Sequence, residues 1–195
     1  MSLFYYYMPA KLASILYDSM YRKGKIMDSQ LQILFNQYEK NINHLICLCE
    51  GKTIVSDFDG TLTRFQYAKN RMLPCKDADI EEYTQAGGDI YANIYILKTM
   101  EYIFKKFNKP DIFILTSTVP SLREEKNKII LDHFDVLPSQ IIHTHNSTSK
   151  LDVLDQIYAQ TKKEIIFLED NYKILLHAEE TKDFVKGYHI SSLIA

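Results

Sequence analysis

The heptapeptide at residues 57–63 constrains this chain more than any other feature of its sequence. It reads Asp-Phe-Asp-Gly-Thr-Leu-Thr and follows the apolar run Thr53–Val55, with only Ser56 between them. Two carboxylates, Asp57 and Asp59, therefore stand close together where a buried strand runs into a glycine turn. One carboxylate of such a pair can attack phosphorus and the other can transfer a proton, while backbone N–H groups of the turn hold phosphate oxygens. The heptapeptide predicts a compact phosphoryl-transfer site at the end of this strand.

From residue 52 onward, short apolar segments alternate with amphipathic ones, which predicts alternating strands and helices. The expected strands are Thr53–Phe58, Ile112–Thr116, Gln140–His143, Glu164–Glu169 and Val185–Ile190, and the expected helices are about Ile90–Phe107, Pro120–Phe134, Ser149–Lys162 and Tyr172–Thr181. Asp89 is the expected cap of the first of these helices, and Pro120 suits the first turn of the next. This alternation predicts an α/β fold, namely a three-layer Rossmann-like parallel sheet with helices on both faces.

The first 50 residues are expected to form a helical extension. Its second helix is predicted to begin after Asp28 or Ser29 and to end at Gly51. The apolar residues that recur at helical spacing along it are Leu31, Leu34, Phe35, Tyr38, Ile42, Leu45 and Cys49. We therefore expect an N-terminal helical extension at residues 1–51 that packs on a core at residues 52–195, with a small flap or cap insertion at about 64–88.

Ligands of open parallel sheets bind outside the carboxyl ends of the strands, so the polar residues at those ends are candidate site residues. Besides Asp57 and Asp59, they are Thr116 and Ser117 after the second strand, Lys150 at the start of the helix that follows the third strand, and Glu169 and Asp170 after the fourth. A carboxylate that attacks a phosphate dianion meets charge repulsion, which Mg²⁺ held by oxygen ligands can offset. In this interpretation Asp57 and Asp170 hold the ion, and Lys150 adds a fixed positive charge.

The heptapeptide resembles the nucleophile motif of the haloacid dehalogenase-like (HAD) hydrolases, whose phosphatase members carry Asp-x-Asp-Gly-Thr-Leu/Val-Thr. The Thr, Lys and acidic elements follow in the order of the other three HAD motifs, over about residues 52–190. By this resemblance Asp57 is the nucleophile and Asp59 the general acid/base. It also implies that Thr116 and Lys150 bind phosphate and that Asp170 binds the metal. Further phosphate contacts are expected from Ser117 and from the backbone of Phe58 and Gly60, and a further metal ligand from the backbone carbonyl of Asp59.

The last motif departs from the common HAD pattern. It reads Glu169-Asp170-Asn171, whereas the family commonly carries Asp-Asp or Gly-Asp with another Asp a few residues later. Two roles for Glu169 stay open. It reaches the metal through a water molecule, or it orients Lys150.

The expected function is Mg²⁺-dependent hydrolysis of a phosphate monoester through an aspartyl-phosphate. An aspartate at position 59 favours a phosphatase, because the resemblance implies no acid there in dehalogenases and a threonine in ion-pumping ATPases. One alternative is a phosphotransferase or phosphomutase of the same superfamily. The other is a non-catalytic phosphate-binding or scaffold module that works through its N-terminal helices.

The composition of the chain limits which classes of partner are expected. The net charge is −2, so no overall electrostatic field favours nucleic acid, which is not an expected ligand. The aromatic N-terminus lacks a long apolar run, so neither a signal peptide nor a membrane span is expected and the chain is placed in the cytoplasm. The three cysteines form no even framework and are expected to be reduced. A small-molecule phosphorylated substrate is expected, and a homodimer through the N-terminal helices stays open.

Overall fold

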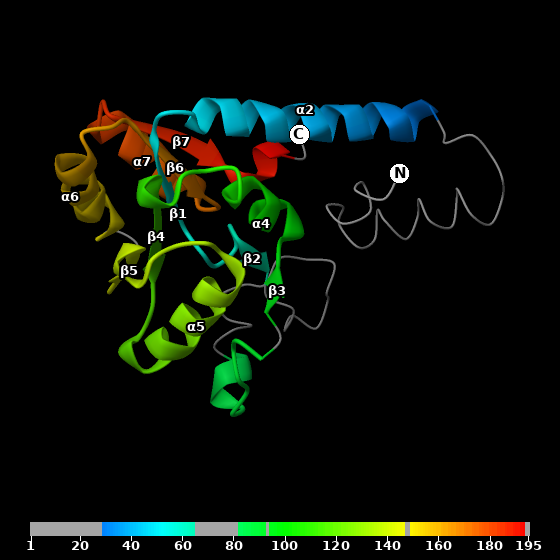
Figure 1. Ribbon diagram of the computed structural model, residues 1–195. Coiled ribbons are helices and arrows are strands. Elements are labelled where there is room, and N and C mark those ends of the chain that lie inside the picture. The colour runs from blue at the N-terminus through cyan, green and yellow to red at the C-terminus, as the bar shows by residue number, and fades with distance from the viewer. Residues whose placement is uncertain (1–28, 65–81, 93, 147–148, 194–195) are drawn as a thin grey trace, which may run out of the picture.

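The computed structural model describes residues 29–64, 82–92, 94–146 and 149–193 (Figure 1). The named elements are α2 (Ser29–Cys49), β1 (Thr53–Ser56), β2 (Thr63–Arg64), β3 (Tyr95–Ile96), α4 (Lys98–Phe104), η2 (Lys109–Asp111), β4 (Ile112–Ser117), η3 (Pro120–Leu122), α5 (Arg123–His133), η4 (Pro138–Gln140), β5 (Ile141–Thr144), α6 (Lys150–Thr161), β6 (Ile165–Glu169), α7 (Tyr172–Thr181), β7 (Val185–His189) and η5 (Ile190–Leu193), where η marks a 3₁₀ helix. A further helical turn lies at 82–85. None of the described helices is long and apolar enough to cross a membrane.

Strand β1 is the central strand of a five-stranded sheet with the order β5-β4-β1-β6-β7. Every pairing in this sheet is parallel, and Val55 of β1 lies opposite Phe113 of β4 and Phe167 of β6. The expected α/β sheet is therefore confirmed. Because the strands are parallel, their carboxyl ends share one edge, and the residues that follow β1, β4 and β6 meet there.

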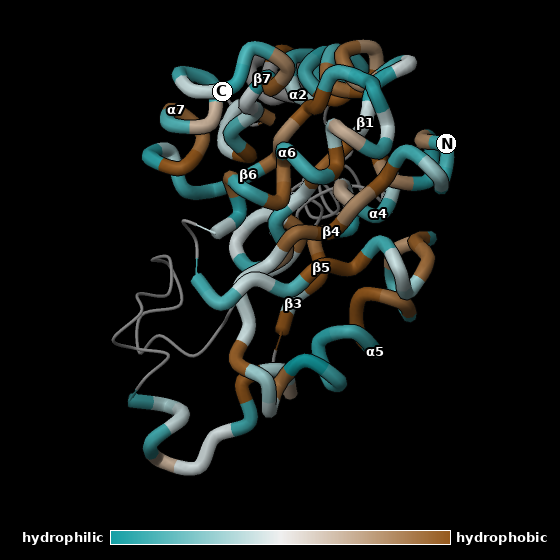
Figure 2. The backbone as a smooth tube through the Cα atoms, turned by 90° about the vertical axis from the view of Figure 1, so that its left-hand side faces the viewer, coloured by the Kyte–Doolittle hydropathy of each residue, from teal (hydrophilic) through white to brown (hydrophobic). Residues whose placement is uncertain are grey.

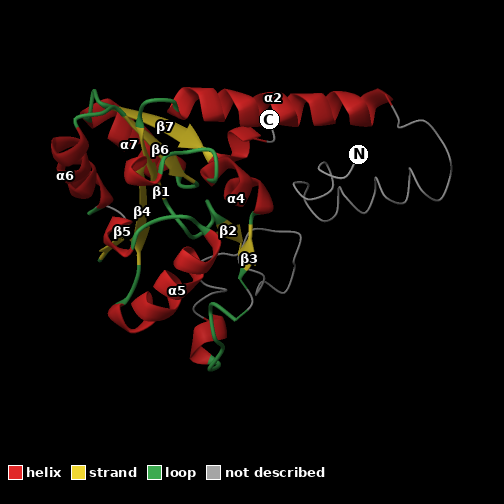
Figure 3. Ribbon diagram, viewed as in Figure 1, coloured by secondary structure: helices red, strands yellow, loops and turns green. Residues whose placement is uncertain are grey.

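Helices cover both faces of this sheet (Figure 3). Ile54 of β1 packs in one apolar cluster with buried residues of α2, α4 and α5. Its neighbour Val55 points the other way, into a second cluster with buried residues of α6 and α7. Strands covered on both faces are largely apolar, as the buried run Ile112–Leu115 of β4 and the hydrophobic colour of that strand in Figure 2 show. The three-layer arrangement follows from this double burial.

Helix α2 is the described part of the N-terminal extension. Ile42, Leu45 and Cys49 of the predicted stripe are buried in the apolar cluster that includes Ile54. Gly51 follows the helix with a φ of 72°, a left-handed conformation that suits a helix end. In Figure 1 the N-terminal half of α2 projects beyond the sheet. Residues 1–28 lie outside the described residues, so the predicted subunit contact stays a prediction.

The predicted helix Ile90–Phe107 is wrong in its first half. The side chain of Asp89 accepts hydrogen bonds from the N–H groups of Tyr91 and Ala92, at 2.9 and 3.1 Å, within a turn and not at a helix start. Strand β3 then pairs antiparallel with β2, and α4 begins only at Lys98. Apolar residues at helical spacing fit a turn followed by a short strand equally well, and a partner strand distant in sequence decided between them.

The other elements lie close to their predicted positions. Strand β1 ends at Ser56, two residues earlier than expected, and Gln140 belongs to η4 instead of β5. Pro120 opens the 3₁₀ turn η3, and the α-helix begins only at Arg123. Most of the predicted flap at 64–88 lies outside the described residues, and the helical turn at 82–85 belongs to its described part.

Candidate active site

Asp57 stands directly after β1, at the carboxyl edge of the sheet. Its N–H donates to the Leu168 carbonyl of β6 at 2.9 Å, which extends the β1–β6 pairing past the strand. The turn that follows needs glycine for two reasons. Gly60 has a φ of 81°, and a Cβ added there would lie 2.1 Å from Oδ2 of Asp170. The heptapeptide therefore brings its backbone against the end of β6 as closely as a residue without a side chain allows.

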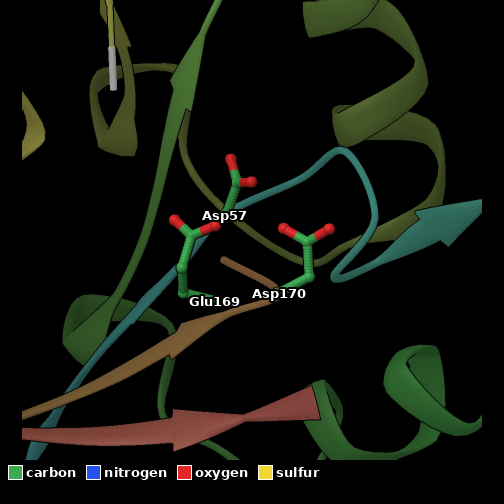
Figure 4. A group of neighbouring side chains, drawn as sticks. All are labelled: Asp57, Glu169 and Asp170. Atoms are coloured by element: carbon green, nitrogen blue, oxygen red, sulfur yellow. The ribbon is translucent and has the colours of Figure 1, made fainter. Parts of the chain in front are cut away.

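Three carboxylates converge at this edge. Asp57, Glu169 and Asp170 each offer an oxygen that lies within 4.8 Å of the oxygens of the other two (Figure 4). We call these residues the carboxylate cluster. Asp57 and Glu169 are buried, whereas Asp170 is exposed, so the cluster opens toward solvent on the side of Asp170.

The electrostatics of the carboxylate cluster favour a bound cation. Burial and the neighbouring charge of Asp57 raise the pKa of Glu169 to about 8. Desolvation and the same charge raise the pKa of Asp170. Both shifts express the cost of holding like charges together away from water. Hard oxygen ligands at this spacing suit Mg²⁺, so the residues fit the ion that the sequence predicts.

Lys150 bridges two members of the carboxylate cluster. Its Nζ lies 2.9 Å from Oδ1 of Asp57 and 2.8 Å from Oε2 of Glu169, and the residue is 2% exposed. Burial works against its charged form, but Asp57 and Glu169 outweigh burial and raise the pKa of its ammonium group. The start of α6 thus places a permanent positive charge beside Asp57, as the sequence predicts for this lysine. When all three carboxylates are ionised, they and this lysine together carry two negative charges, which a divalent cation would balance.

Glu169 holds Lys150 and also accepts a hydrogen bond from the backbone of the next turn. Its Oε1 lies 3.2 Å from the N–H of Asn171. Of the two roles left open by the sequence, orientation of Lys150 corresponds to a contact in the structure. Glu169 also belongs to the carboxylate cluster, so a water-mediated contact to the ion stays a prediction.

Asp59 lies beside the carboxylate cluster and has an altered acidity. Desolvation raises its pKa to about 6, although Lys126 opposes the shift, and Asp57 adds to it. One of its oxygens, Oδ1, is buried and has no hydrogen-bond partner within the described part of the chain. A carboxyl group in such surroundings can exist protonated or ionised near neutral pH, as a general acid/base requires.

Lys126 contacts Asp59 and was not predicted from the sequence. This residue of α5 is 1% exposed, and its Nζ lies 2.5 Å from Oδ2 of Asp59. Its neighbour at helical spacing, Ile130, is buried in the apolar cluster below. The sequence signal was therefore a lysine on the inward stripe of an amphipathic helix, where an apolar residue is the rule.

The end of β4 lies against the same lysine. Thr116 is fully buried, and its Oγ1 accepts a hydrogen bond from Nζ of Lys126 at 3.0 Å. The carbonyl of Ser117 lies 3.3 Å from that Nζ, and the Ser117 hydroxyl is paired with Thr144. The structure therefore brings Thr116 and Ser117 to the predicted edge. Their contacts to phosphate stay predictions, as do those of the backbone at Phe58 and Gly60 and the metal contact of the Asp59 carbonyl.

His189 fixes the backbone of Asp170. Its Nδ1 accepts a hydrogen bond from the N–H of Ser191 at 3.2 Å, so its Nε2 carries the proton. That Nε2 donates to the carbonyl of Asp170 at 2.8 Å. The last strand, β7, thus supports the end of β6 that carries the carboxylate cluster, and no sequence pattern indicated this support.

Comparisons with known proteins find only distant similarity. No family model matches it, and no curated protein matches it. Among solved structures it is similar to the N-terminal part of the protein BF1531 from Bacteroides fragilis, which contains a phosphatase domain complexed with Mg. The identity is 15% and the TM-score 0.39, over 91% of this chain and 48% of that one, so the chain spans about half the length of that structure. A likeness this distant carries no argument about function, which rests on the side chains.

Proposed function

We propose that this protein is a Mg²⁺-dependent phosphatase of the HAD type, which hydrolyses a phosphate monoester through an aspartyl-phosphate at Asp57. The observation that carries the proposal is the convergence of Asp57, Glu169 and Asp170 within 4.8 Å at the carboxyl edge of the sheet. An acidic cluster alone has many explanations. This one has a buried lysine, Lys150, paired with Asp57, and a second acid of raised pKa, Asp59, beside it.

The first half of the reaction forms a bond between a carboxylate oxygen of Asp57 and phosphorus. The bond from phosphorus to the ester oxygen breaks, and its electron pair leaves with that oxygen. Asp59 in its protonated form supplies the proton that the leaving oxygen takes up. When bound by Asp57 and Asp170, Mg²⁺ would supply charge neutralisation for the phosphate oxygens. Lys150 adds positive charge on the Asp57 side.

In the second half, a water oxygen attacks phosphorus and the bond to Asp57 breaks. Asp59, now ionised, takes the proton of that water, so inorganic phosphate leaves and both aspartates return to their starting states. The two halves need the same carboxyl group first as an acid and then as a base. A pKa of about 6 allows both forms at neutral pH.

A panel of phosphate monoesters, assayed for phosphate release with and without Mg²⁺, tests the proposal. We expect turnover that needs Mg²⁺, is lost in Asp57→Asn and falls by about 10²–10⁴-fold in Asp59→Asn. Asp155→Asn removes an acid that pairs with Lys182 on the surface and is the matched control with full activity. Full turnover by Asp57→Asn would refute the nucleophile.

The same panel separates the alternatives from the proposal. Transfer of the phosphoryl group to added alcohols or sugar phosphates in preference to water would favour a phosphotransferase or mutase. Mg²⁺ binding without turnover of any ester would favour the non-catalytic module. We further propose that the substrate is a small phosphorylated molecule and that the protein acts in the cytoplasm. The esters that the panel turns over test the substrate class, and imaging of the tagged protein in cells tests the location.

A further inference from the structure

Lys126 is a buried charge for which the proposed reaction has no direct use. It lies in α5 and pairs with Asp59, whereas Lys150 opens α6 and pairs with Asp57 and Glu169. An ammonium group removed from water is costly unless its donors find acceptors. Its partners therefore show what it does.

Each of the donors of Lys126 has an acceptor. A lysine carries three N–H groups and no acceptor. They meet Oδ2 of Asp59 at 2.5 Å, Oγ1 of Thr116 at 3.0 Å and the carbonyl of Ser117 at 3.3 Å. No donor is left for a substrate phosphate. This distinguishes Lys126 from a phosphate-binding lysine.

The surroundings of the ammonium group support this reading. The ring of Phe58 lies 5.7 Å from Nζ and that of Tyr91 lies 5.6 Å from it. Aromatic faces at this range stabilise a cation and shield it from water. Two of the three acceptors belong to the end of β4, a strand bonded directly to β1. The ammonium group is therefore fixed to the rigid sheet.

We propose that Lys126 is a positioning residue that clamps the Asp59 carboxylate to the end of β4 and so aims Asp59 at the leaving-group oxygen of the phosphate ester. This inference rests on the proposed function. Asp59 follows β1 within a turn, and its other oxygen, Oδ1, has no partner in the described part of the chain. Lys126 supplies the hydrogen bond that selects one orientation of this side chain. General acid catalysis requires such placement, because proton transfer needs hydrogen-bond reach.

Dependence on the leaving group tests the clamp. A simple alkyl phosphate needs a proton on its departing oxygen, whereas 2,4-dinitrophenyl phosphate departs without one. In Lys126→Met, kcat/KM should therefore fall at least about tenfold more with the alkyl ester than with the dinitrophenyl ester, because general acids contribute about 10²–10⁴-fold. The parameter kcat/KM is chosen since it excludes the later release of phosphate from Asp57. Equal losses with both esters, or no loss with either, would overturn the inference.

Two controls separate this role from folding and from charge. Lys128→Met removes an exposed lysine from the same helix and should change neither ester. Magnesium affinity, measured by calorimetry, should be the same in Lys126→Met as in the wild type within about twofold, because the clamp holds no member of the carboxylate cluster. A large loss of affinity would show that the substitution disturbs the metal site instead, and would count against the inference.

The double variant Asp59→Asn/Lys126→Met covers the case in which Lys126→Met leaves Asp59 as an unpaired buried charge and does not fold. Compared with Asp59→Asn alone, the added Lys126→Met should cost the two esters equally, because the group it positions is already lost. An alkyl-specific loss in this background would show that Lys126 acts independently of Asp59 and would overturn the inference. If the wild-type protein turns over neither ester, the proposed function itself is contradicted, and the inference about Lys126 is contradicted with it.

Discussion

Substitution of Lys150 by methionine removes the cation from the centre of the carboxylate cluster while keeping its length and apolar stem. The ammonium group lies 2.9 Å from Oδ1 of Asp57 and 2.8 Å from Oε2 of Glu169. Methionine can pack in the same space, because lysine and methionine side chains have similar volumes. The change therefore tests charge and not packing.

The expected cost follows from these two contacts. A pair of unit charges about 4 Å apart attracts by about 4 kcal/mol at the dielectric typical of partly buried sites, and Lys150 makes two such pairs. The desolvation cost of the lysine itself offsets part of this attraction. Removal of one partner from a buried ion pair typically costs about 3–5 kcal/mol, because the remaining charge stays buried without compensation. We expect the free energy of unfolding of Lys150→Met to fall by about that amount in buffer without metal.

Urea unfolding followed by circular dichroism measures this change. The second substitution Glu169→Gln should restore part of the lost stability in the Lys150→Met background, because it removes one of the stranded charges. Saturating Mg²⁺ should restore part of it too, since an ion that binds the folded state stabilises it. Neither rescue, or a loss below about 1 kcal/mol in the single variant, would refute the electrostatic reasoning.

Three further predictions follow from particular contacts. Gly60→Ala should abolish Mg²⁺ binding in calorimetry, because its Cβ would lie 2.1 Å from Oδ2 of Asp170; wild-type affinity would contradict the close approach. The pKa of His143 is lowered to about 4 by burial, and its Nδ1 has no partner in the described residues, so its protonation is disfavoured in the folded state. The free energy of unfolding should therefore fall by on the order of 1–2 kcal/mol more in the wild type than in His143→Gln as the pH drops from about 6.5 to about 4. An equal fall in the two proteins would contradict this role of His143. Leu45→Ala should lower the free energy of unfolding by about 2–5 kcal/mol and leave phosphate release unchanged, which urea unfolding and the ester panel check; a smaller loss would mean that α2 is not part of the core.

Much of the site was predictable because its residues follow parallel strands. Asp57 and Asp170 lie at the ends of apolar runs that predict strands, and parallel strands bring such residues to one edge. Lys150 could be placed for the same reason, since it opens the helix after β5. The strand pattern thus located the carboxylate cluster without any knowledge of side-chain contacts.

The parts that were missed depend on contacts between distant segments. Lys126 reads in sequence as a charged residue of an amphipathic helix, and only folding shows that it faces Asp59, 67 positions away. The turn at Asp89 and the pairing of β2 with β3 replaced half of a predicted helix for the same reason. A local sequence pattern contains no information about contacts with a distant part of the chain.

The most direct test of the central claim is a search for phosphate covalently bound to Asp57. Wild-type protein with Mg²⁺ and an activated phosphate ester is quenched in acid, digested and examined by mass spectrometry. The account predicts one added phosphoryl group on the peptide that contains Asp57, accumulating further in Asp59→Asn with 2,4-dinitrophenyl phosphate, because the second half-reaction then lacks its base. Steady phosphate release with no labelled peptide in either protein, or a label on another residue, would contradict it.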